Sequence, residues 1–173
     1  MKPTLIYCVA ASLDGYIARP DGSSDWLTGD DEAPPCDGLL LGRATYDALS
    51  EHWPRSDKPT LLLTRHLPMH LPPQVRARHC TPSEALDELA ALGCQRVRLL
   101  GGSSLAGNCF AAGLLDELVV KLMPHLLGAG VPLFASGMEG RLQLLDSYNV
   151  SGGGIHLHYR VLPEAVHAST EPG

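Results

Sequence analysis

The chain has 173 residues, of which 45% are hydrophobic and 18% are charged, and its net charge is −6. This length suits a single domain, and the hydrophobic content excludes an intrinsically disordered chain. The negative charge, with no cluster of basic residues, argues against a nucleic-acid partner. No stretch reaches the roughly 20 apolar residues of a membrane span, so we expect a soluble protein that binds no membrane.

Buried strands alternate with helices along most of the chain. Near-continuous apolar runs at Thr4–Ala11, Gly38–Leu41 and Thr60–Thr64 are typical of parallel strands covered on both faces. Further strands are predicted at Val75–His79, Arg96–Leu100 and Leu114–Met123, and helices at Ala44–Glu51, Ser83–Leu92 and Ser103–Ala112. The last two apolar segments, Leu142–Val150 and Ile155–Leu162, predict an antiparallel hairpin. The pattern predicts one α/β domain over residues 1–163, followed by a flexible tail at 164–173.

The cysteine and histidine patterns give no sign of a metal or disulfide framework. The five cysteines contain no C-x-x-C pair, which favours reduced thiols in a cytoplasmic protein. His156 and His158 alternate in a late strand and so share one face, but no third ligand lies nearby in the sequence. We interpret this pair as solvent-facing or packed across strands, and we expect no metal site.

Polar or glycine residues follow several of the predicted strands, at the positions where ligands of open α/β sheets bind. Asp14 follows the first strand; it either forms an Asx turn before Gly15 or presents an acid to a cleft. The long segment Pro20–Asp37, which contains Trp26, is of a length that is usually functional or mobile.

Two arginines and a glycine pair stand at the other strand ends. Arg43 begins a helix, where a cation is unfavourable unless it and the helix meet the same anion; otherwise it is a solvated side chain. Thr64 and Arg65 follow TLLL, and Gly101-Gly102 precede Ser103 at a helix start. That junction is either an ordinary turn with Ser as the N-cap or a phosphate-binding backbone. Neither G-x-G-x-x-G nor G-x-x-x-x-G-K-[ST] occurs. Together the two arginines, the glycine pair and the two helix starts suit a ligand with several phosphates.

A family resemblance rests on six segments in order: SLDGYIA, DGSSDWL, LGRATYDAL, LLLTR, LLGGSSL and GLLDELVVKLMPHLLGAGVPLF. Over about residues 4–162 the chain resembles the dihydrofolate-reductase-like superfamily. Within it, the chain is most similar to the C-terminal reductase domain of bifunctional riboflavin-biosynthesis proteins and their stand-alone relatives. The resemblance implies a mixed, mostly parallel central sheet flanked by helices, a C-terminal antiparallel hairpin, NADPH as cofactor and a homodimer.

Carried over position by position, the resemblance implies roles for individual residues. The nicotinamide side would be lined by Ala11, Gly15 and Ile17, and the cofactor phosphates would be held by Gly42, Arg43 and Thr45. The adenosine 2′-phosphate would meet Thr64 and Arg65. The pyrophosphate and nicotinamide ribose would be wrapped by Gly101, Gly102, Ser103, Ser104 and Leu105. The substrate side would hold Asp14, also the expected catalytic residue, with Trp26 and Thr28.

The sequence departs from the riboflavin reductases on the substrate side. Leu100 stands where they commonly have Glu before the glycine pair, Tyr16 stands where Lys or Arg is frequent, and the segment that anchors a sugar phosphate is not recognisable. We expect an NADPH-dependent reductase that delivers hydride to a C=N or C=O carbon of a small heterocycle, resembling 5-amino-6-(5-phosphoribosylamino)uracil reductase. The alternatives are a dihydrofolate or pterin reductase, a non-catalytic NADPH-binding protein on the same fold, and a phosphoryl-transfer enzyme.

Overall fold

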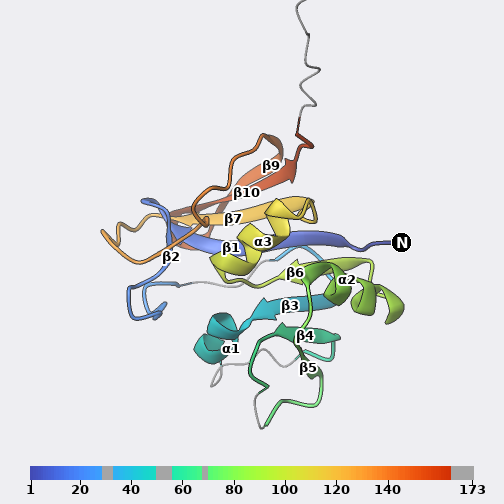
Figure 1. Cartoon of the computed structure of the whole chain (residues 1–173). Coiled ribbons are helices and arrows are strands. Elements are labelled where there is room, and N and C mark those ends of the chain that lie inside the picture. The colour runs from blue at the N-terminus through green and yellow to red at the C-terminus, as the bar shows by residue number, and fades with distance from the viewer. Residues whose placement is uncertain (29–32, 50–55, 68–69, 165–173) are drawn as a thin grey trace, which may run out of the picture.

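A mixed sheet with helices on its faces forms the body of the protein (Figure 1). The computed structural model describes residues 1–28, 33–49, 56–67 and 70–164. Its strands are β1 (Thr4–Ser12), β2 (Tyr16–Ala18), β3 (Gly38–Gly42), β4 (Thr60–Leu63), β5 (Val75–Arg78), β6 (Arg96–Leu99), β7 (Glu117–Met123), β8 (Val131–Pro132), β9 (Leu142–Val150) and β10 (Gly154–Val161). Its helices are α1 (Arg43–Leu49), α2 (Pro82–Ala91) and α3 (Ser103–Ala111), and a 3-10 turn at Ser151–Gly153 joins β9 to β10.

The main sheet has the order β5-β4-β3-β6-β1-β7-β10-β9. The strands from β5 to β7 are parallel, whereas β10 is antiparallel to both β7 and β9. The predicted α/β class, with a mostly parallel sheet and a C-terminal antiparallel hairpin, is therefore confirmed. Of the predicted tail, only Glu164 is among the described residues, and residues 29–32 of the long segment also lie outside them.

Two details differ from the sequence-based prediction. The strand expected from Leu114 begins at Glu117, because the Leu114 N–H donates to the Cys109 carbonyl (2.9 Å) and so completes the end of α3. The strands β2 and β8 were not predicted; they are two or three residues long and pair only with each other. The two strands lie more than a hundred residues apart in the sequence, so the local pattern of residues could not reveal their pairing.

Alternation along β1 divides the apolar residues between the two faces of the sheet. Leu5 and Tyr7 are fully buried in the larger core cluster, which includes residues of α2 and α3, whereas Ile6 and Cys8 form part of a smaller cluster on the opposite face. Both helices lie against the same face of the sheet in Figure 1. The other face carries smaller apolar clusters, one of which, formed by Leu41, Leu62 and Val75, packs against Tyr46 of α1.

The helix α2 has strong start signals in its sequence. Thr81 and Glu84 form a capping box, in which the Thr81 hydroxyl accepts from the Glu84 N–H (3.2 Å) and Glu84 accepts from the Thr81 N–H (2.8 Å). None of the helices in the described ranges is both long and apolar enough to cross a membrane. All five cysteines are free thiols, as predicted.

Candidate functional site

The carboxyl ends of β3, β4 and β6 border a cavity of about 780 Å³. Eight of the residues predicted to bind a cofactor line it: Gly42, Arg43, Thr64, Arg65, Gly102, Ser103, Ser104 and Leu105. These residues come from three separate strand-to-helix or strand-to-loop junctions. The parallel order of the sheet brings them to one edge, as the strand-end rule predicts.

The glycine pair brings backbone unusually close to the start of α1. The Gly42 N–H donates to the Gly101 carbonyl (2.8 Å), which fastens the junction after β6 to the end of β3. Gly101 has φ +119°, and a Cβ there would lie 3.1 Å from Thr45 Oγ1. Only glycine therefore fits this position without displacing Thr45.

The amino end of α3 offers unshielded backbone donors to the cavity. Its N-cap is Gly102, which has no side chain to accept from the first turn, so the alternative with Ser as the N-cap is wrong. The first bond of the helix runs from the Ala106 N–H to the Gly102 carbonyl (3.0 Å). The preceding N–H groups of Ser103, Ser104 and Leu105 have no acceptor within the helix, and such groups favour an anion.

The cations of this cavity differ in how they are held. Arg43 donates from Nε to Asp47 Oδ1 (2.8 Å) and from one terminal nitrogen to the His66 carbonyl (3.0 Å). Within the described ranges, Arg65 makes no hydrogen bond or ion pair through its side chain and is exposed. Arg65 is therefore the arginine of this rim that can turn to a ligand without breaking a contact.

A second cavity, of about 500 Å³, adjoins the first. Ala44, Gly102 and Val131 line both, so the two cavities meet beside the glycine turn. The predicted cofactor residues Ile17 and Thr45 line this second cavity. Leu100, at the position where the resemblance expects Glu, lines it too, so this wall carries no carboxylate.

The floor of the second cavity holds basic residues that the sequence reasoning did not assign to a binding site. Arg98, Lys121 and His156 line it from β6, β7 and β10, together with Lys58 from the segment before β4. A usable signal was present, because Lys121 interrupts the apolar run from Leu118 to Met123 in β7.

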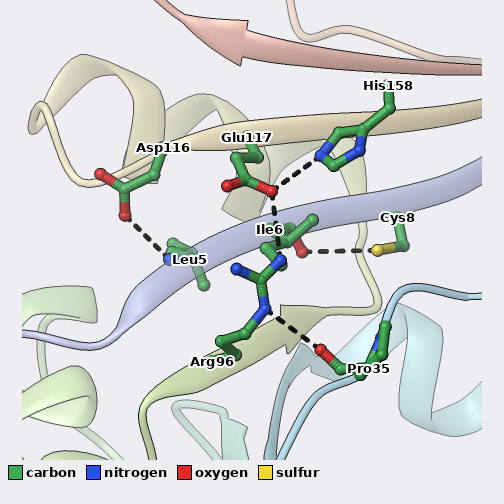
Figure 2. Close-up of polar contacts among 8 residues, drawn as sticks. All are labelled: Leu5, Ile6, Cys8, Pro35, Arg96, Asp116, Glu117 and His158. Carbon is green, nitrogen blue, oxygen red and sulfur yellow. Dashed lines mark hydrogen bonds and ion pairs between the residues drawn. The ribbon is translucent and has the colours of Figure 1, made fainter. Parts of the chain in front are cut away.

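A partly buried ion-pair network lies on the same sheet face, next to this floor. Figure 2 shows Glu117 between Arg96 and His158: Arg96 donates to Glu117 Oε2 (3.3 Å), and His158 Nε2 lies 2.7 Å from the same oxygen. Arg96 also donates from Nε to the Pro35 carbonyl (3.2 Å). The network thereby ties the segment before β3, whose Cys36 lines the second cavity, to the central strands.

The histidine pair takes part in packing across strands. His156 is 5% exposed and stacks on Tyr148 of the neighbouring β9, with ring centroids 4.3 Å apart and planes at 13°. This confirms the interpretation of cross-strand packing for His156. Across the described residues, no three His, Cys, Asp or Glu side chains are grouped so that they could hold a metal ion.

Asp14 lies outside both cavities and closes a loop. Its carboxylate accepts from Ser12 Oγ (2.6 Å) and from the N–H groups of Leu127 (3.1 Å) and Gly128 (2.8 Å). The hydrogen bond from Ser12 and those from the backbone lower the pKa of Asp14 to about 2. The carboxylate is therefore ionised at neutral pH, and a catalytic role for it stays a prediction.

Several other predicted site residues also line neither cavity. They are Ala11, Gly15, Gly101, Trp26 and Thr28. Ala11 is fully buried in the core, and Gly101 acts through the turn described above. Trp26 is 5% exposed and its ring packs against His125 (5.9 Å between centroids), whereas Thr28 is exposed.

The sequence model described as the RibD C-terminal domain matches residues 3–156. The chain belongs to the RibD C-terminal domain family. This confirms the predicted membership, and the family has a reductase-like fold related to dihydrofolate reductase.

Relatives of this RibD C-terminal domain protein support the same placement. The uncharacterised protein YwjB of Bacillus subtilis is 29% identical over 178 residues, which cover 91% of this chain and 97% of YwjB. A crystal structure from Shewanella sp. PV-4, provisionally assigned to riboflavin biosynthesis, is 27% identical with a TM-score of 0.78, covering 92% of this chain and 99% of that one.

Dihydrofolate reductase of Enterococcus faecalis, solved in complex with NADP(H), shares the fold of this family member. Its TM-score is 0.70 at 17% identity, and the match covers 91% of this chain and 96% of the reductase. The predicted dihydrofolate-reductase-like fold is thus confirmed.

Proposed function

We propose that the protein is an NADPH-dependent reductase that delivers hydride to a C=N or C=O carbon of a small heterocycle. The observation that supports this most is the junction of the two cavities at Ala44, Gly102 and Val131. One cavity collects the residues expected to hold a dinucleotide, and the other offers a neighbouring space for a substrate. The leading specific activity is that of a 5-amino-6-(5-phosphoribosylamino)uracil reductase.

The residues of the larger cavity fit the phosphates of such a cofactor. The free N–H groups at the start of α3 would hold the pyrophosphate, because both their hydrogens and the helix dipole favour negative charge. Thr64 and Arg65 would meet the 2′-phosphate at the far side of the cavity. When bound, the dihydronicotinamide supplies the hydride, while the protein orients the ring and excludes water.

The Arg65→Ala variant tests the assignment of the 2′-phosphate. Because a charged hydrogen bond to the phosphate is lost, NADPH affinity should fall about tenfold, whereas NADH affinity should stay unchanged. Titration by nicotinamide fluorescence measures both. The matched control is Arg76→Ala, an exposed arginine of β5 that lines neither cavity. Equal losses of affinity for NADPH and NADH would contradict the assignment of Arg65 to the 2′-phosphate.

Turnover separates a reductase from a non-catalytic NADPH-binding protein. The wild-type protein should oxidise NADPH in the presence of 5-amino-6-(5-phosphoribosylamino)uracil or another member of a panel of heterocycles that includes dihydrofolate. The reaction should give one reduced product per NADPH consumed. Tight NADPH binding with no consumption across the panel would favour the binding protein instead.

A further inference from the structure

The second cavity has a one-sided distribution of charge. Its described lining includes Lys58, Arg98, Lys121 and His156, and contains no aspartate or glutamate. The protein as a whole carries a net charge of −6, so this concentration of basic groups runs against its composition. A hollow lined by one sign of charge, with low-dielectric walls, concentrates ligands of the opposite sign.

Strand register places three of these side chains on one face of the sheet. Ile6 is paired with Arg98, and Ala10, four residues along β1, is paired with Lys121. Lys121 is in turn directly opposite His156 in the antiparallel pair of β7 and β10. Side chains directly opposite each other in such a pair stand roughly 5 Å apart at Cβ. Lys121 and His156 can therefore act on the same small group.

The carboxylate of Glu117, on the same face of the sheet, is held by other basic residues. Glu117 is bound to Arg96 and His158, as Figure 2 shows, and it does not line the cavity. Arg98, Lys121 and His156 also have interactions within the protein. These three basic side chains of the floor stand on strands β6, β7 and β10, whereas Lys58 lies in the segment before β4.

We propose that this floor binds an oxyanion carried by the substrate, with Arg98, Lys121 and His156 as its donors. Carboxylate and phosphate groups share the required chemistry, because both accept charge-assisted hydrogen bonds from guanidinium, ammonium and imidazole groups. The remaining lining, which includes Val9, Leu27 and Val119, is apolar and suits a planar ring. This inference rests on the proposed function only in assigning the ligand of the cavity as the substrate.

Three probes test the proposal by calorimetric titration, each with and without saturating NADPH. Uracil and orotate differ by a ring carboxylate, so the difference between their affinities measures the contribution of the anionic group to binding. Ribose 5-phosphate tests phosphate as the source. We expect orotate, ribose 5-phosphate or both to bind at least about tenfold more tightly than uracil.

Substitutions on the floor locate the site. Arg98→Met and Lys121→Met should each reduce the anion's affinity about tenfold, while uracil affinity and NADPH affinity stay within about twofold. Lys58→Met, in the segment before β4, provides a third variant if either strand substitution prevents folding. The control Arg160→Met removes the same charge from β10 outside the cavity and should change nothing.

Two results would overturn the inference. One is an equal affinity for uracil, orotate and ribose 5-phosphate, including no measurable binding of any of them. The other is an anion preference that survives all three floor substitutions. Failure of NADPH to bind, with the anion preference and its loss in the variants intact, would overturn the proposed reductase and leave this site standing.

Discussion

At the scale of single residues, Asp14 shows how one carboxylate can organise a loop. It joins the end of β1 to residues 127–128 through two backbone N–H groups, and Ser12 holds it from its own segment. From the sequence, Asp14 could either form an Asx turn before Gly15 or present an acid to a cleft. In the structure the carboxylate accepts from Ser12 and from backbone N–H groups more than a hundred residues along the chain, so it joins two distant segments and does not form an Asx turn before Gly15.

The Asp14→Asn variant should lose stability in a pH-dependent manner. The pKa of Asp14 is lowered from 3.8 to about 2, so the charged carboxylate stabilises the folded state fully above about pH 4. This contribution is lost as the pH falls through about 2. The difference in unfolding free energy between wild type and variant should therefore be constant from pH 7 to 5 and shrink toward pH 3, as urea denaturation can measure.

The control for this measurement is Asp87→Asn, an exposed carboxylate of α2. Its replacement should change the free energy of unfolding only slightly, because this side chain is exposed. Turnover separates the two roles of Asp14: if the variant loses activity at a pH where it is fully folded and binds NADPH normally, the catalytic prediction holds. An unchanged rate would leave Asp14 as a structural residue.

At the scale of elements, the junction from β6 to α3 is the part of the site most restricted by its backbone. The Gly101→Ala variant should be less stable by about 1–3 kcal/mol, since its φ of +119° is unfavourable for alanine. It should also lose NADPH affinity about tenfold or more, because its Cβ would press on Thr45, which lines the second cavity.

Gly113 offers a matched control at a distance from the site. It has φ +67°, and a Cβ at this position would meet no atom within 4 Å, so Gly113→Ala introduces backbone strain without a clash. That variant should lose stability and keep its NADPH affinity. Equal NADPH affinity for both variants, measured by fluorescence titration, would contradict the role given to the turn.

Much of this architecture was readable from sequence because buried parallel strands have a simple pattern. The runs that include Leu39–Leu41 and Leu61–Leu62 are nearly continuous in apolar residues, and the structure buries these leucines on both faces. The lining of the larger cavity was also accessible, since each of its junctions follows a predicted strand. The floor of the second cavity was not, because Arg98, Lys121 and His156 come together only through the order of strands in the sheet.

At the scale of the whole molecule, one edge of the main sheet is left exposed. The outermost strand, β9, is solvent-exposed from Leu142 to Asn149. Leu142, Leu144 and Ile155 are 40%, 51% and 43% exposed, and the register places them on one face of the hairpin. A long edge strand with apolar side chains invites pairing with another chain, and we propose that this edge forms the homodimer.

The Leu144→Lys variant tests this dimer. A charge placed in an apolar interface should weaken association about tenfold or more, and light scattering after size exclusion should then show monomer at concentrations where wild type is dimeric. Leu126→Lys is the control, since Leu126 is 73% exposed and lies outside the sheet. A wild-type protein that stays monomeric at high micromolar concentration would contradict the proposal.

The proposed function depends most on the larger cavity holding a phosphorylated dinucleotide. The most direct measurement is a titration of the wild-type protein with NADPH and with NADH, followed by nicotinamide fluorescence. We expect micromolar binding of NADPH and binding of NADH at least about tenfold weaker, because Thr64 and Arg65 would meet a phosphate that only NADPH carries. No binding of either nucleotide would contradict both the reductase proposal and the cofactor residues assigned to the cavity.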